Sequence, residues 1–171
     1  MTMKRALVVY ESMFGNTGLV AEAVAEGLRT GMTVDLVEVG SAPPVLGEEV
    51  ELLVVGGPTH AFSMSKPGTR ADAARQGADA RAAAGAGLRE WVDQVGKGTA
   101  RPVVVAFDTK VKRPRLPGSA ARAALTRLRR AGFRTVKPAE NFYVGGTKGP
   151  LVDGELDRAR NWGATCAAEM A

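Results

Sequence analysis

The chain has 171 residues, of which 45% are hydrophobic and 24% are charged, as in an ordinary globular protein of about one domain. No apolar run approaches the ~20 residues of a membrane-spanning helix. The apolar stretch near the start, residues 6–10, is too short for a signal peptide, so we expect a cytoplasmic protein. With one cysteine and one histidine, the chain cannot form an intrachain disulfide and has too few such side chains for a thiolate or imidazole metal site.

The positive charge is concentrated in one part of the sequence. The net charge is +5, yet residues 101–137 contain eleven lysines or arginines and a single acid, Asp108. Such a segment is either an ordinary solvated surface or a site for an anionic partner. Few aromatic residues lie nearby to stack on bases, which disfavours nucleic acid as that partner.

Strands are predicted where apolar residues run almost continuously or alternate with polar ones. The segments are 5–10, 33–39, 51–56, 102–107, 133–136 and 140–144. Three of them, 5–10, 51–56 and 102–107, are apolar on both sides, as strands buried on both faces of a parallel sheet are.

Helices are predicted between these strands, where apolar residues recur every three to four positions. The segments are 20–28, 87–95, 119–131 and 151–170. Residues 71–87 are rich in alanine and glycine, and we interpret them as a mobile flap or a frayed helix. Buried strands that alternate with helices indicate an α/β fold, and right-handed crossovers make its parallel sheet doubly wound.

In a doubly wound sheet, ligands bind at the carboxyl ends of the strands, which here are followed by loops after residues 10, 56 and 107. The first loop, residues 12–17, reads Ser-Met-Phe-Gly-Asn-Thr and leads directly into a helix. Backbone amides at such a helix end suit a phosphate, although Asn16 or Thr17 can also serve only as the helix cap. The loop matches neither the GxGxxG dinucleotide motif nor the GxxxxGK nucleotide motif.

Three motifs together resemble the flavodoxin family, whose members bind flavin mononucleotide (FMN). YESMFGNT at 10–17 resembles the family's phosphate loop. GGPTHAF at 56–62 resembles the glycine-rich loop beside the isoalloxazine ring, and FDTK at 107–110 lies where the family's third flavin loop is found. The resemblance covers nearly the whole chain. It implies one flavodoxin-like domain over residues 1–171, with a five-stranded parallel sheet in the order 2-1-3-4-5.

The resemblance also implies roles for residues in the three loops. The first loop would contact the phosphate, the second the flavin ring, and the third the ring or the ribityl chain. These residues are Ser12, Met13, Phe14, Gly15, Asn16 and Thr17 in the first loop, Pro58, Thr59, His60, Ala61 and Phe62 in the second, and Asp108, Thr109 and Lys110 in the third. The first loop contains no acid, which suits a dianionic phosphate.

Four residues with distinctive side chains are candidates for a role at the site or in the core. His60 is a candidate proton donor to a reduced flavin or a quinone, or its ring only packs over the flavin edge. Trp91 and Trp162 have apolar neighbours at helical spacing and are predicted in the core. Cys166 is interpreted as a small buried filler rather than a redox thiol.

Two functions agree with an FMN-binding redox protein. The first is an electron carrier between a reductase and an acceptor, which we favour because a short chain leaves little room for a second substrate. The alternative is an enzyme of the FMN-dependent NAD(P)H:quinone oxidoreductase type. The positive net charge and the lack of glycine at residues 60–62 argue against a typical carrier, whereas the absence of a visible nicotinamide site argues against the enzyme.

A flavin-free binding module is a third function, and the intact 12–17 loop argues against it. The partner of a redox protein would be another redox protein or a small electron acceptor. That partner would be acidic or anionic if the basic stretch Lys110 to Arg115 takes part in docking.

Overall fold

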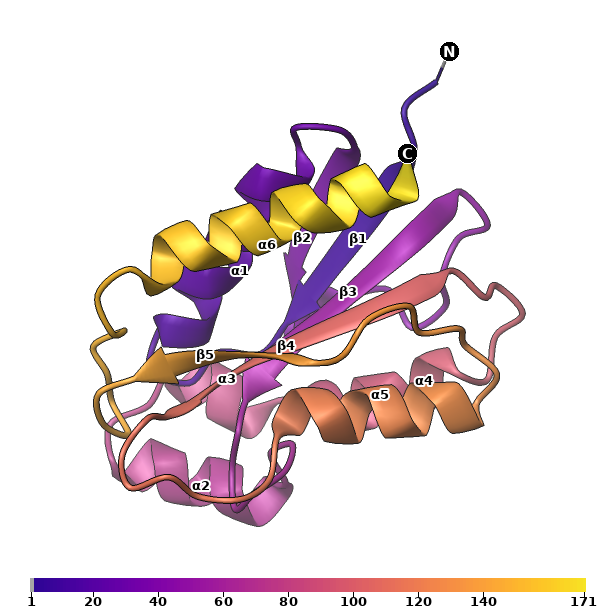
Figure 1. Cartoon of the computed structure of the whole chain (residues 1–171). Helices are drawn as coiled ribbons and strands as arrows, with labels where there is room; N and C mark the ends of the chain where they lie inside the picture. Colours follow the sequence, from indigo (N-terminus) through magenta and orange to yellow (C-terminus); the bar gives the residue numbers. More distant parts are fainter. Residues whose placement is uncertain (1) are drawn as a thin grey trace.

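Five parallel strands form a twisted sheet in the computed structural model, which describes residues 2–171 (Figure 1). The strands are β1 (Arg5–Tyr10), β2 (Thr33–Glu38), β3 (Val50–Pro58), β4 (Val103–Val111) and β5 (Glu140–Val144). Their order across the sheet is β2-β1-β3-β4-β5, which confirms the predicted order. The chain first winds outward from β1 to β2 and then in the other direction, so the order reverses between β1 and β3.

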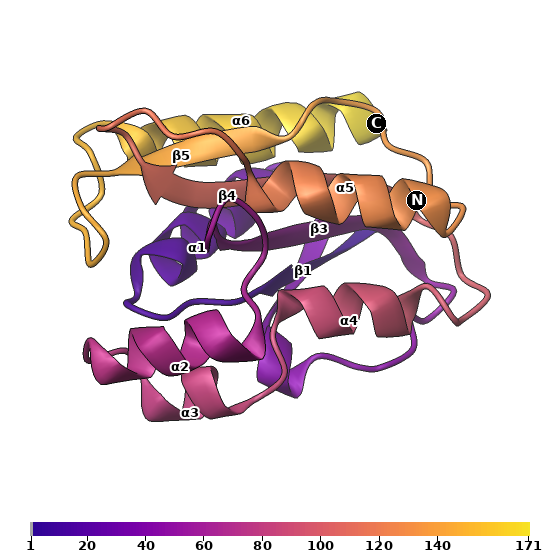
Figure 2. The same cartoon turned by 90° about the horizontal axis from the view of Figure 1, so that it is seen from below.

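Two layers of helices cover the sheet (Figures 1 and 2). One face carries α1 (Asn16–Leu28) and α6 (Glu155–Met170), and the other carries α4 (Leu88–Val95) and α5 (Ala120–Arg130). Two short helices, α2 (Pro67–Arg75) and α3 (Ala80–Ala84), lie near the carboxyl ends of the strands, and a 3-10 turn, η1 (Val39–Ser41), follows β2. Within residues 2–171, no helix has both the length and the apolar character needed to cross a membrane.

The middle of each central strand is apolar because both of its faces are buried. In β1, Leu7 and Val9 belong to the core cluster under α4 and α5, whereas Ala6 and Val8 belong to the cluster under α1 and α6. Successive side chains of a strand point to opposite faces, so both sets of side chains in the middle of a strand covered on both sides are buried.

Helices α1 and α6 approach each other closely through two glycines. A Cβ atom on Gly27 would lie 2.0 Å from the Arg160 carbonyl oxygen, and one on Gly163 would lie 2.2 Å from that of Val24. Any other residue at either position would force the two helices apart.

The predicted core residues are confirmed. Trp91 is 6% exposed and Trp162 is 8% exposed. The Trp162 ring packs edge-on against those of Phe107 and Phe142, with centroids 6.1 and 6.2 Å away. Burial raises the pKa of the Cys166 thiol to about 11, so the thiol stays protonated near neutral pH and fills space.

One predicted strand is absent, and the predicted ends of two others are wrong. Residues 133–136 form no strand, and only Thr135 makes an isolated bridge, to Val104. Pairing does not continue because Pro138 has no N–H to donate. Strands β3 and β4 extend past residues 56 and 107 to Pro58 and Val111. Asp108, Thr109 and Lys110 therefore lie in a strand rather than in a loop.

Residues 71–87 contain helical structure on both sides of a turn, where we expected a flap or a frayed helix. Helix α2 starts earlier, at Pro67, where the Lys66 amide donates to Thr69 Oγ1 at 2.9 Å. Helix α3 is capped by Asp79, whose Oδ1 accepts from the amide of Arg81 at 2.8 Å. These caps explain why an alanine-rich segment with few buried side chains forms helices. Its mobility stays a prediction.

Candidate functional site

A cavity of about 310 Å³ lies at the carboxyl ends of β1, β3 and β4. Its walls come from four parts of the chain: the loop that leads into α1, the loop after β3, helix α2, and the end of β4 with the segments beyond it. The lining residues are Met13, Phe14, Asn16, Thr17, Pro58, Thr59, His60, Ala61, Thr69, Asp72, Ala73, Gln76, Thr109, Lys110, Val111, Leu116, Val144 and Thr147. The cavity therefore lies where the strand order predicts a ligand.

The amino end of α1 is open toward this cavity. Gly15 precedes the helix in a left-handed conformation with φ of 93° and has no side chain to cap it, and the first turn contains no acid. The first amides of a helix have no intrahelical acceptor. Here Gly18 donates its amide to Ser12 Oγ at 3.1 Å and Leu19 to the Gly15 carbonyl at 3.1 Å. The amides of Asn16 and Thr17 are left for a ligand.

A pair of buried hydroxyls joins the first loop to β4. Thr17 Oγ1 and Thr109 Oγ1 lie 2.7 Å apart, and both residues line the cavity. One hydroxyl donates to the other, so the accepting hydroxyl keeps its own hydrogen for a ligand. The side chain of Asn16 is held by the segment after β5, because its Nδ2 donates to the Lys148 carbonyl at 3.1 Å.

The loop after β3 makes a tight turn without glycine at its tip. The amide of His60 donates to the Ser63 carbonyl at 2.7 Å, and that of Ser63 donates back at 2.9 Å. Between them, Ala61 and Phe62 have φ values of 46° and 71°, a conformation that bulky side chains rarely adopt. Such strain persists only where the surrounding structure fixes it, and it clusters at functional sites.

His60 faces the cavity with a neutral ring. Its Nδ1 lies 3.1 Å from Thr69 Oγ1 on α2. Burial lowers the pKa of His60, while the Glu11 carboxylate opposes this shift and Arg70 adds to it. The imidazole is therefore uncharged near neutral pH and presents a polar ring rather than a cation.

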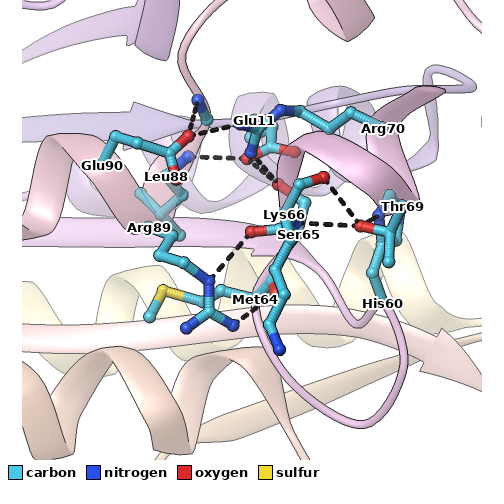
Figure 3. Close-up of polar contacts among 11 residues, drawn as sticks. Glu11, His60, Met64, Ser65, Lys66, Thr69, Arg70, Leu88, Arg89 and Glu90 are labelled. Carbon is cyan, nitrogen blue, oxygen red and sulfur yellow. Dashed lines mark hydrogen bonds and ion pairs between the residues drawn. The ribbon is translucent and has the colours of Figure 1, made fainter.

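A buried polar cluster behind His60 was not foreseen from the sequence (Figure 3). Glu11 is 1% exposed, and its Oε1 accepts from the Leu88 amide at 2.6 Å and from Ser65 Oγ at 2.9 Å. Arg70, on α2, is 3% exposed and donates to Ser65 Oγ at 2.9 Å and to Glu90. The cluster ties α2 to the end of β1 and to the start of α4.

This cluster positions α2 as a wall of the cavity. The side chains on that wall are Thr69, Asp72, Ala73 and Gln76. Beyond α2, the Asp79 amide donates to the Met13 carbonyl at 3.1 Å, which holds the start of α3 against the first loop. The only sequence signal for the cluster is Glu11, a charged residue directly after a buried strand.

Ten of the fourteen residues expected at the site line the cavity, and four do not. Ser12 and Gly15 shape the first loop from behind, and Phe62 is 55% exposed at the tip of the second loop. Asp108 is fully buried and faces α5 instead. Its Oδ2 accepts from Ser119 Oγ and from the Ala121 amide, and its Oδ1 accepts from Asn141 Nδ2.

Thr109 and Lys110 remain at the cavity. Because Asp108 lies within β4, its side chain points to the opposite face of the sheet from that of Thr109. The Lys110 ammonium donates to the Gly118 carbonyl at 2.6 Å, which holds this cation at the cavity wall. Among residues 2–171, no group of three or more His, Cys, Asp or Glu side chains is arranged to hold a metal ion.

Neither known family models nor curated proteins match the sequence. Solved structures do match. A flavodoxin from the domain Archaea has 20% sequence identity and a TM-score of 0.67, covering 96% of this chain and 97% of its own. Oxidised flavodoxin 1 from Bacillus cereus has 14% identity and a TM-score of 0.69, covering 98% and 99%.

A short-chain flavodoxin associated with a non-canonical PDU bacterial microcompartment is also similar, at 16% identity and a TM-score of 0.65, with 99% of both chains covered. The similarity spans the whole length of these proteins, and the strand order is the predicted one. The chain therefore has the flavodoxin fold.

Proposed function

We propose that residues 1–171 form one FMN-binding domain that acts as a redox protein. One observation carries the proposal: the three segments that resemble the flavin-binding segments of flavodoxins converge on a single cavity, and ten of their residues line it. FMN, when bound, supplies electron transfer in steps of one or two electrons. The solved structures of similar fold support the same cofactor, since several of them are flavodoxins.

The donors at the amino end of α1 fit a phosphate. The amides of Asn16 and Thr17, the Thr17–Thr109 hydroxyl pair and the positive helix end all favour an anion, and no acid lies in the first turn. Charge-assisted hydrogen bonds of this kind are the strong ones. They would give FMN its advantage over riboflavin, which has no phosphate.

The remaining walls fit the flavin ring. Residues 58–61 would hold one side of the ring, and Thr109, Lys110 and Leu116 the other. A reduced flavin carries negative charge, which the Lys110 ammonium would stabilise. The Asp108 carboxylate would disfavour that charge, but three donors hold it on the opposite face of β4.

We favour an electron carrier between a reductase and an acceptor. An FMN-dependent NAD(P)H:quinone oxidoreductase is the alternative, and one observation supports it. Helix α2 adds Thr69, Asp72 and Gln76 to the cavity, and these polar groups could orient a small substrate. A carrier needs no such wall, because its partner is another protein.

The first test compares the affinities of FMN and riboflavin for the purified protein by fluorescence titration. We expect FMN to bind far more tightly, and equal affinities would contradict the phosphate site. The second test follows NADH or NADPH oxidation by the FMN-loaded protein with a benzoquinone as acceptor. A carrier shows turnover only when a separate reductase is added, whereas an enzyme turns over alone.

A further inference from the structure

A second cavity of about 560 Å³ borders the flavin cavity. It lies between the end of β4, the 112–119 loop, the start of α5 and β5. The two cavities share Lys110, Val111 and Leu116 as a common wall. A ligand in the second cavity would therefore lie directly beside one in the first.

Five cationic side chains line this second cavity, and no acid does. They are Lys110, Lys112, Arg113, Arg115 and Arg122. In the described part of the chain, none of the five forms an ion pair with a carboxylate, whereas several other arginines do. Arg127, one turn or more along α5 from Arg122, is bonded to Asp93 at 2.7 Å.

The acids nearest to the cavity do not line it and have hydrogen-bond partners of their own. Asp108 lies behind Ser119 and Asn141, and both of its oxygens accept hydrogen bonds. Glu155 accepts from Arg158 at 2.7 Å and from the Tyr143 amide at 2.8 Å. The wall of the cavity therefore carries five positive charges and no carboxylate.

We propose that this cavity binds the pyrophosphate group of a nucleotide-sized organic anion. Arginine forks match phosphate oxygens in pairs, and three of the five cations are arginines. The volume lies in the range of small-molecule sites and exceeds what a single phosphate ion fills. Asn141, Tyr143 and Ser119 add uncharged polar groups to the wall.

The side chains, and not a helix end, supply the attraction. The first three backbone amides of α5 already donate hydrogen bonds within the protein. Ala120 donates to Thr59 Oγ1, Ala121 to Asp108 Oδ2 and Arg122 to Ser119 Oγ. Removing cations should therefore remove the binding. The proposal goes beyond FMN binding and holds whether or not the first cavity takes a flavin.

The test is isothermal titration calorimetry of the full chain with inorganic pyrophosphate, adenosine, AMP and ADP at one fixed ionic strength. We expect saturable binding of pyrophosphate and ADP, weaker binding of AMP and none of adenosine. The variant K112Q/R113Q/R115Q should bind ADP at least about tenfold more weakly, the effect of losing one or more charge-assisted hydrogen bonds.

The matched control is K97Q/R130Q/R134Q. It removes the same charge from exposed residues that do not line the cavity. It should bind ADP as the original protein does. Circular dichroism and FMN titration of both triple variants show whether each remains folded, since Lys112, Arg113 and Arg115 do not line the flavin cavity.

Four outcomes would overturn the proposal. The first is an absence of saturable binding, and the second is an equal loss of affinity in the control variant. The third is stoichiometric displacement of pyrophosphate by FMN, which would locate the anion at the end of α1. The fourth is a poly-glutamate peptide that binds more tightly than ADP and loses affinity in K112Q/R113Q/R115Q, which would assign the cavity to an acidic protein.

Discussion

Helices α1 and α6 begin in the same way but have opposite electrostatic surroundings. Each follows a glycine in the left-handed conformation, Gly15 with φ of 93° and Gly154 with φ of 87°, and neither glycine offers a side chain to cap the helix. The first turn of α6 contains Glu155 and Asp157, whereas that of α1 contains no acid.

This difference separates a structural helix end from one that is open to a ligand. The positive end of a helix favours a negative charge, and α6 obtains that charge from its own sequence. Asn16 and Thr17, at the start of α1, line the cavity instead, while no residue of α6 does. At the start of α1, the negative charge would come from the phosphate of bound FMN instead of from an acidic side chain.

The largest expected effect comes from giving α1 the acid that α6 has. Asn16→Asp places a carboxylate beside the phosphate, and like charges in contact cost several kcal/mol. FMN affinity should fall by about a hundredfold or more, while riboflavin affinity should change little. Fluorescence titration with both flavins measures this.

In the apoprotein the same substitution has two opposing effects on stability: it removes the hydrogen bond from Asn16 Nδ2 to the Lys148 carbonyl, but an acid at a helix amino end is favourable. Urea unfolding without flavin therefore separates a loss of binding from a loss of folding. FMN affinity that is unchanged in Asn16→Asp would mean that the α1 end is no more a ligand site than the α6 end.

A smaller effect is expected from removing a single donor. Thr17→Ala deletes one hydroxyl of the buried Thr17–Thr109 pair and should weaken FMN binding by ~1–3 kcal/mol, the range for hydrogen bonds to charged groups. Thr17→Ser keeps the hydroxyl and is the matched control. An equal loss in both variants would assign the effect to the Thr17 methyl group and to packing.

The sequence was sufficient for those features that depend on local pattern. Apolar runs identified the central strands because both of their faces are buried, and the loop motifs follow the strands that meet at the cavity. The predicted placement of Asp108 in a loop is wrong, because β4 continues past residue 107. Once the strand continues to Val111, alternation alone turns Asp108 away from Thr109.

The cluster around Glu11 could not be predicted in the same way. Glu11 and Ser65 are 54 residues apart along the chain, and Glu11 and Leu88 are 77 residues apart. No local pattern relates residues at such distances. The cluster holds helix α2 at the cavity. The amino-acid composition of α2 is equally consistent with a packed helix and with a frayed one, so the sequence alone does not predict this wall.

The smallest expected effect lies at α6 and completes the comparison of the two helix ends. The hydrogen bond from Arg158 is the main cause that holds the pKa of Glu155 below its usual range, and the Tyr143 amide also lowers it, while burial opposes the shift. A carboxylate with a lowered pKa stabilises the fold above its unfolded-state pKa. That contribution is lost as the pH falls through the folded-state pKa.

Glu155→Gln should therefore lower the free energy of unfolding at pH 7 by ~1 kcal/mol, the scale of a single hydrogen bond to a charged partner on a half-exposed arginine. The difference from the original protein should shrink as the pH falls below about 4.5, where the unfolded carboxyl is protonated. Urea unfolding at a series of pH values measures both effects.

Asp157→Asn is the matched control for this experiment, because Asp157 is also in the first turn of α6 but its side chain is 81% exposed. It should change stability by less than Glu155→Gln does, since screened surface charges contribute little. FMN affinity should stay unchanged in both variants, because the acids of α6 neutralise a helix end that has no ligand. A loss of FMN affinity in Glu155→Gln as large as that in Thr17→Ala would show that the two helix ends are coupled, and the contrast between a structural end and a ligand-binding end would then fail.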